Sequence, residues 1–240
     1  MGNDNDNREK IIPVHSVPLS KMKNIISCIC SIKKMDRFNR GFFCKIPFSD
    51  NLHNLPVIIM LNMLLTEEDL MPGKNLSLTF EDNSKNIYID TNRKMFFCKE
   101  YNISIIEIKS TDNINQDFFQ EIDENIFNER LDKIYLNKSI CILSNANNEE
   151  LKFSMGNIYE IDTKNYSFMN NCSTFSGGTG GPIFNVKNCK IIGIQYGIMK
   201  NDVKQDNYAI FLKLPIEKFY ENEKKKSETL NKAYEKEKII

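Results

Sequence analysis

Short runs of apolar residues, separated by polar clusters, recur along most of the chain and predict β-strands. Residues 103–108 alternate partly between apolar and polar, as expected of a strand with one buried face. Clusters of Asn, Asp, Gly and Lys between the runs are typical of turns. The predicted strands form two series, 41–47, 55–61, 75–80, 86–90 and 103–109, then 139–143, 151–161, 166–169, 182–186, 190–196 and 208–212.

The pattern changes at both ends of this strand region and in its middle. Apolar spacing over 21–32 predicts a short helix that leads into a strand, and Ile216, Phe219 and Tyr220 share a helical face after Pro215. The polar stretch between the two series reads as a linker. We therefore expect an all-β protein of two antiparallel barrels with a C-terminal helix. The predicted boundaries are 1–24 for an N-terminal arm, 25–115 and 135–214 for the barrels, 116–134 for the linker and 215–240 for the helix and charged tail.

Composition limits the classes of partner. Among 240 residues, Lys+Arg and Asp+Glu both number 32, so no global field would attract nucleic acid or an anionic membrane. The polar, acidic beginning is unlike a signal peptide, and the longest apolar run, 55–65, is too short to span a bilayer. These features predict a cytoplasmic protein.

The seven cysteines do not indicate a metal or disulfide framework. Their number is odd and no CxxC pair occurs. Most of them lie in apolar runs, so buried free thiols in a reducing compartment are expected. No cofactor and no metal are implied.

The segment Gly177-Gly178-Thr179-Gly180-Gly181-Pro182 resembles the nucleophile loop of trypsin-like serine proteases, with threonine in the place of serine. Three other segments are similar to parts of that family in the same chain order. They are 41–48 for the opening strand, 55–65 for the strand and turn of the catalytic histidine, and 99–106 for the segment of the catalytic aspartate. The resemblance covers about residues 25–215 and is to the intracellular protozoan and fungal-type members. It implies a chymotrypsin-like double β-barrel.

The resemblance also places the three catalytic positions, at Met63, Asn102 and Thr179. Serine-type acyl transfer needs a hydroxyl, a base, a carboxylate that orients the base, and an oxyanion hole. The Met63 thioether is not a base, and the neutral Asn102 amide would not stabilise an imidazolium. Thr179 keeps a hydroxyl, but its methyl group restricts χ1.

Loss of the whole triad costs about a million-fold in kcat. The sequence therefore predicts a catalytically inactive homologue, a pseudoprotease, that acts as a peptide- or protein-binding or scaffold module. Gln195, Tyr196 and Gly197 would line the groove in which members of the family bind substrate as an added β-strand. Alternatively, these three residues are an ordinary edge strand. The oxyanion loop, Gly177, Gly178 and Thr179, either keeps a carbonyl-binding pocket or only preserves a tight turn.

Two other functions remain open at the level of sequence. One is an active serine/threonine-type endopeptidase with rearranged machinery, in which Thr179 is the nucleophile and His53 the base; His15, the other histidine, lies in the N-terminal arm. A cysteine nucleophile is not expected, because Cys172 precedes Thr179 by seven residues and fits a pocket wall better. The second alternative is an interaction protein whose charged C-terminal helix is the working part.

Overall fold

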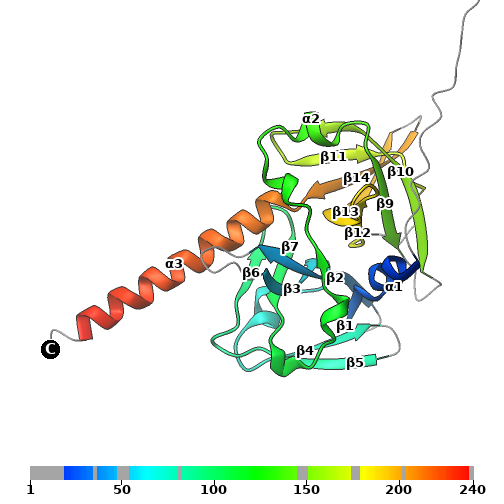
Figure 1. Cartoon of the computed structure of the whole chain (residues 1–240). Coiled ribbons are helices and arrows are strands. Elements are labelled where there is room, and N and C mark those ends of the chain that lie inside the picture. Colours follow the sequence, from blue (N-terminus) through cyan, green and yellow to red (C-terminus); the bar gives the residue numbers. More distant parts are fainter. Residues whose placement is uncertain are drawn as a thin grey trace, which may run out of the picture.

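Two β units and a long helix make up the protein. The computed structural model describes residues 19–34, 37–47, 54–80, 83–144, 151–173, 179–201 and 204–237. The first unit is an open sheet and the second is a closed barrel, and they lie one below the other in Figure 1.

The first unit is an eight-stranded half-barrel. Helix α1 (Leu19–Ser27) leads directly into it, as the sequence predicts for 21–32. Its order is β5-β4-β1-β2-β3-β7-β6, with β8 parallel to β2. The strands are β1 (Ile29–Lys34), β2 (Arg37–Pro47), β3 (Asn54–Leu61), β4 (Asn75–Phe80), β5 (Asn83–Tyr88), β6 (Met95–Cys98), β7 (Ile103–Glu107) and β8 (Gln120–Glu121).

A buried arginine connects the end strand β5 with β7, the second strand from the other end, which do not pair with each other. Arg93 donates to the carbonyl oxygens of Tyr88, at the end of β5, and of Glu107, at the end of β7, over 3.1 and 2.8 Å. It also forms a two-pronged pair with Asp112, with N–O distances of 2.7 and 2.9 Å. Both side chains of this ion pair are almost fully buried. Because guanidinium and carboxylate satisfy each other's hydrogen bonds, the pair is tolerated out of water.

The second unit is a closed six-stranded antiparallel barrel with the order β10-β11-β14-β13-β12-β9. Its longest strand, β13, pairs with the whole length of β14. A short helix, α2 (Leu131–Tyr135), precedes it. The strands are β9 (Ser139–Ser144), β10 (Lys152–Asp162), β11 (Ser167–Asn170), β12 (Pro182–Asn185), β13 (Lys190–Asn201) and β14 (Lys204–Phe211).

The connection between the units touches both of them. Strand β8 pairs with β2, and Ile122 then forms a parallel bridge with Ile191 of β13. Asp123, only 1% exposed, accepts hydrogen bonds from the side-chain amides of Asn125, Asn185 and Asn188. The connection also has three short 3-10 turns, Ser110–Asp112, Gln116–Phe118 and Glu124–Phe127; a fourth such turn, Glu67–Leu70, follows β3.

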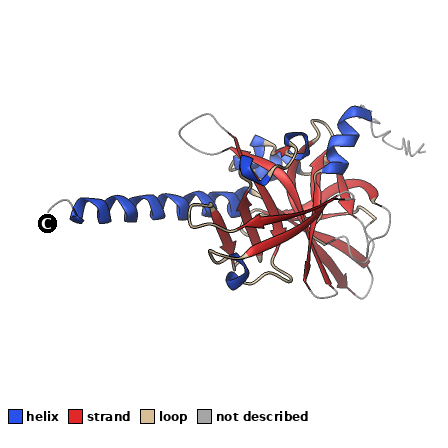
Figure 2. Ribbon diagram, turned by 90° about the horizontal axis from the view of Figure 1, so that it is seen from below, coloured by secondary structure: helices blue, strands red, loops and turns tan. Residues whose placement is uncertain are grey.

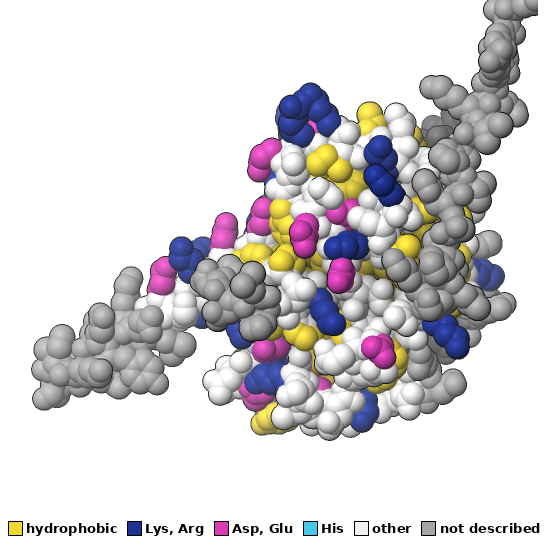
Figure 3. Space-filling view, in the orientation of Figure 1, with side chains coloured by type: hydrophobic (Ala, Val, Ile, Leu, Met, Phe, Trp, Pro, Cys, Tyr) yellow, Lys and Arg dark blue, Asp and Glu magenta, His cyan; other side chains and the backbone are white. Residues whose placement is uncertain are grey.

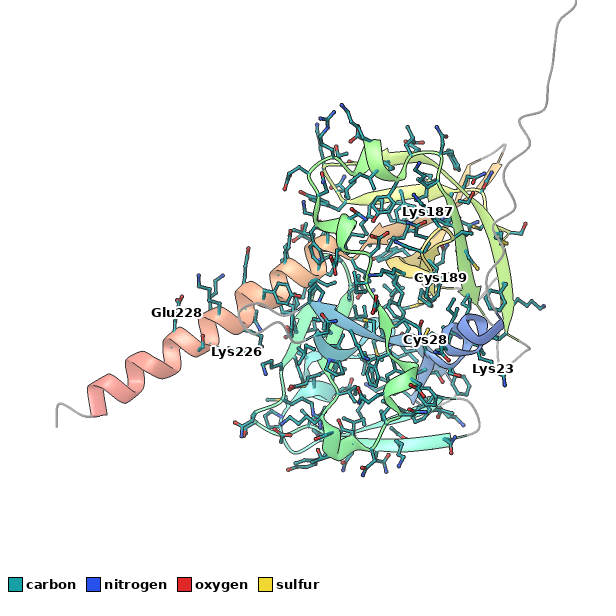
Figure 4. All side chains as sticks on the ribbon, in the orientation of Figure 1. Lys23, Cys28, Lys187, Cys189, Lys226 and Glu228 are labelled. Carbon is teal, nitrogen blue, oxygen red and sulfur yellow. The ribbon has the colours of Figure 1, made fainter. Side chains whose placement is uncertain are left out.

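Helix α3 (Lys213–Glu237) follows the barrel and returns to the first sheet. Ile216 and Phe219 are fully buried, which confirms the apolar face predicted after Pro215. The Nζ of Lys218 pairs with Glu100, and the Nζ of Lys226 donates to the carbonyl oxygen of Met95 over 3.2 Å. Beyond these contacts the helix extends away from both β units (Figures 1 and 2), and Glu228 lies just past the Lys226 contact in Figure 4.

Strands in the middle of the first sheet are buried on both faces. Ile58 and Met60 of β3 face a core that residues of the first unit alone form. Val57, Ile59 and Leu61 face a second core, which includes residues of both units and which we call the shared core. This double burial explains why β3 is a continuous apolar run rather than an alternating one.

The predicted all-β, chymotrypsin-like double β-barrel with a C-terminal helix is confirmed, with the first unit as a half-barrel. Strands β6 and β8 are absent from the sequence prediction. The strand expected at 86–90 lies a few residues earlier, as β5, because Asn83 to Lys85 pair with β4 despite their polarity.

Candidate functional site

Two of the three predicted catalytic positions lie at the same end of two neighbouring strands of the first sheet, β3 and β7. Leu61, the last residue of β3, pairs with Ile103, the first residue of β7. The next residue, Asn62, donates its backbone N–H to the carbonyl oxygen of Asn102 over 2.7 Å. The register therefore brings Met63 and Asn102 to the same end of neighbouring strands.

The loop that carries Thr179 packs against the neighbouring strand of the same sheet. Gly180 has φ of 89°, and a β-carbon at this position would lie 2.8 Å from the carbonyl oxygen of Arg40 on β2. Glycine is thus required here by both conformation and space. The loop is also fixed to its own barrel, since Gly180 donates to the carbonyl oxygen of Gln195 and Gln195 donates to that of Gly181, over 2.7 and 2.8 Å. Thr179, half-buried, stands at the junction of the two units.

The side chains at these positions do not form a catalytic relay. Met63 is 61% exposed and has no basic nitrogen. Asn102 has φ of 52°, a left-handed conformation that asparagine tolerates better than most residues. Its carbonyl oxygen is engaged by Asn62, so a local structural role accounts for its position.

The remaining candidate groups are of two kinds. His15, His53, Gly177 and Gly178 lie outside the described residues, so the predictions of a His53 base and of an oxyanion loop stay predictions. The cysteines are all free, as expected, and Cys172 is buried in the shared core. Burial raises the pKa of the Cys172 thiol to about 12, so it is neutral near pH 7 and is a poor nucleophile.

The predicted groove follows the edge of β13. Gln195 is buried, whereas Tyr196 and Gly197 are half-buried. The ring of Tyr196 packs edge-to-face on Tyr208 of β14, with centroids 5.8 Å apart. Strand β13 pairs with β14 as far as Asn201, but with β12 only as far as Ile194. Among the described strands, none pairs with the β12 side of β13 after Gln195, and we call this side of the strand the open edge. The side-chain amide of Gln195 donates to the carbonyl oxygen of Gly197 over 2.8 Å.

Three buried polar residues at the end of β3, Asn39, Asn62 and Ser104, were not predicted from the sequence as part of the site. Asn39 donates its side-chain amide to the carbonyl oxygen of Leu61, and the Ser104 hydroxyl donates to Oδ1 of Asn62, each over 2.5 Å. Asn39 is 1% exposed and Ser104 0%. The available signal was a polar residue at a core-facing position of a strand, which is uncommon unless it is hydrogen-bonded.

Within the described ranges, no three His, Cys, Asp or Glu side chains are arranged to hold a metal ion. No helix there combines the length and apolar character needed to cross a membrane. On the face drawn in Figure 3, basic and acidic side chains are interspersed.

Comparison with solved structures shows the class of fold. The chain superposes on a serine endoprotease from Yersinia pestis with a TM-score of 0.56 and 12% identity, over 86% of this chain and 68% of that chain. For catalytically active tobacco etch virus protease complexed with product, the values are 0.51 and 14%, over 82% and 78%. For the HtrA-type protease AlgW with tripeptide they are 0.57 and 11%, over 85% and 62%. No protein-family model and no curated protein sequence matches this chain.

These likenesses and the topology agree. The chain has the chymotrypsin-like double β-barrel fold of serine proteases, with a half-barrel as its first unit.

Proposed function

We propose that this protein is a catalytically inactive member of the chymotrypsin-like protease class that binds a peptide or protein segment. The observation that carries the proposal is the pairing of Asn62 with Asn102, which puts Met63 and Asn102 at the same end of neighbouring strands, and neither side chain is a base or a carboxylate. A hydroxyl at Thr179 without these groups lacks the means to lose its proton at neutral pH.

The open edge of β13 supports the binding part of the proposal. An extended peptide satisfies unpaired backbone N–H and C=O groups by adding a strand to such an edge, and side-chain contacts then give selectivity. Met63 adds an exposed, flexible apolar side chain just after the end of β3. Methionine adapts to differently shaped partners and is common on promiscuous binding surfaces.

Peptide binding and hydrogen exchange test this function together. The full-length chain is screened against a displayed library of random 12-residue peptides, and amide hydrogen exchange is followed with and without a selected peptide. Added-strand binding predicts slower exchange over 196–201, where β13 gains a partner. Exchange over 83–88 on the far edge of the first sheet serves as the internal control. Binding that protects only other segments, or no binding at all, contradicts the proposal.

The alternative, an active endopeptidase that uses Thr179, is separated from this proposal by its chemistry. It predicts cleaved peptides and a complete loss of cleavage in Thr179→Ala. The inactive homologue predicts intact peptides with both proteins.

A further inference from the structure

Arg40 lies beside the loop that carries Thr179. Its strand, β2, directs Phe42, Cys44 and Ile46 into the shared core, and Arg40 is on the same face, two residues before Phe42. A β-carbon at position 180 would lie 3.3 Å from the β-carbon of Arg40, so the root of the arginine side chain adjoins the loop. The residue is half-buried at the junction of the two units.

Arg93 and Lys213 are the buried cations of the described residues, and each has an acidic partner. The half-buried Arg40 has no acidic partner among the described residues. Arg93 is paired with Asp112 through two short hydrogen bonds. The ammonium group of Lys213, 2% exposed, contacts Glu129 at 3.1 Å and lies over the ring of Tyr166. Burial lowers the pKa of the Arg40 guanidinium, and no carboxylate of the described residues raises it again. Among the described residues, the half-buried Arg40 beside the loop is therefore an arginine whose guanidinium has no carboxylate partner.

We propose that Arg40 selects an acidic side chain, Asp or Glu, in the peptide that binds at the junction. The inference rests on the proposed peptide-binding function and adds the chemistry of its partner. A guanidinium presents a planar fork of N–H donors that a carboxylate matches with two parallel hydrogen bonds. Partial burial strengthens this pair, because water competes less for it than at an open surface.

The position of Arg40 favours an internal acidic residue over a C-terminal carboxylate. The open edge of β13 belongs to the second unit, whereas Arg40 is on β2 of the first. In the proposed binding mode, a peptide that adds to β13 and continues across the junction towards β2 offers a side chain, rather than its terminus, to Arg40. A basic or neutral residue at that point would leave the guanidinium unpaired and would therefore weaken binding. Peptides without an acid at that position are thus disfavoured, while those with an acid gain an ion pair.

The test compares matched peptides and matched variants of the full-length chain. Peptides selected from the random 12-residue library are synthesised with each Asp or Glu replaced by Asn or Gln, and separately with an amidated C-terminus. Dissociation constants are measured by fluorescence polarisation for wild type, Arg40→Gln, Arg40→Lys and the control Arg130→Gln, an exposed arginine far along the chain. Thermal unfolding checks that each variant is folded, and the peptide replacements need no variant at all.

The expected result is enrichment of acidic residues in the selected peptides and a roughly 10- to 100-fold weaker affinity when one particular acid is neutralised. Arg40→Gln should cause a similar loss for the acidic peptide and none for its neutral form, Arg40→Lys an intermediate loss, and Arg130→Gln no change. Peptides that bind equally well with and without acids overturn the role of Arg40 but leave the peptide-binding function intact. Sensitivity to C-terminal amidation alone overturns the assignment to a side chain. Absence of any binding peptide overturns both proposals.

Discussion

Asn102 occupies a backbone conformation that asparagine tolerates, at the place where the family resemblance implies a catalytic carboxylate. Its φ of 52° is left-handed, and its carbonyl oxygen fixes Asn62. Met63, by contrast, is largely exposed, so its side chain is not part of either core. At Asn102 the backbone conformation therefore accounts for the residue type without any catalytic role.

Asn102→Ala should lower the free energy of unfolding by about 1 kcal/mol, because alanine adopts the left-handed region less readily. Asn102→Gly should be close to neutral, since glycine enters that region freely. Urea unfolding of the two variants checks this prediction. Equal destabilisation by alanine and glycine would show that the side chain, rather than the backbone conformation, matters.

Asp123 is the residue at which pH should affect stability most clearly. Burial favours its neutral form, but hydrogen bonds from Asn185, Asn188 and Asn125 outweigh burial and hold the pKa of this carboxyl below its usual range. Its contribution is therefore present above the unfolded pKa of about 3.9 and disappears as pH falls through the lower folded pKa.

Asp123→Asn should cost about 2–3 kcal/mol at pH 7, because buried amide donors lose an ionised acceptor. The difference from wild type should narrow on acidification below about pH 4. Urea unfolding at pH 7 and pH 3 measures it, with Asp132→Asn, an exposed carboxyl on α2, as the control. If the free energies of unfolding of wild type and Asp123→Asn differ by the same amount at pH 7 and pH 3, the ionised carboxylate is not the source of the stabilisation.

At the scale of elements, strands with strong apolar patterns were predictable and weak ones were not. β3 and β7 are identifiable from their aliphatic residues, which line both cores. β8 has only Gln120 and Glu121, two polar residues that give no apolar pattern, although they pair with β2. β6 (Met95–Cys98) is short and lies at the end of the sheet, so its pattern spans too few positions to be recognised.

The open sheet also depends on a contact that no periodicity reveals. Arg93 reaches the ends of β5 and β7, which are separated by the rest of the sheet in pairing order. Arg93→Ala should lower the free energy of unfolding by about 3–5 kcal/mol, because it leaves Asp112 buried without its partner. Chemical denaturation against Arg130→Ala as the exposed control tests this, and a loss below 1 kcal/mol would refute the role given to Arg93.

At the scale of the molecule, the contacts between the two units among the described residues include the shared core, the segment around Asp123, α3, and the loop at Gly180 packed on β2. The sequence predicted the order of these parts, and the structure adds how the segment between the units contacts both. The assignment of Met63 and Asn102 to catalytic positions stays a prediction, and the structure adds that they lie at the same end of β3 and β7. Arg40 was not predictable from the sequence, because its proximity to Gly180 arises only when the units pack. Membership of the protozoan and fungal-type group stays a prediction.

Truncation of α3 distinguishes the peptide-binding proposal from the alternative in which the charged C-terminal helix is the working part. Removal of residues 221–240 retains the buried Ile216 and Phe219, so the body of the protein should stay folded. Peptide affinity should then be unchanged, because the proposed groove is on β13 and β2. Fluorescence polarisation with the truncated chain tests this, and a loss of binding with an unchanged melting temperature would favour the helix as the working part.

The central claim is that the protein binds peptides without cleaving them, and mass spectrometry of a peptide library incubated with the full-length chain tests it most directly. We expect bound peptides to be recovered intact after prolonged incubation, with the unaltered protein and Thr179→Ala giving the same spectra. New termini that appear with the unaltered protein and vanish with Thr179→Ala would contradict the account and establish an active endopeptidase.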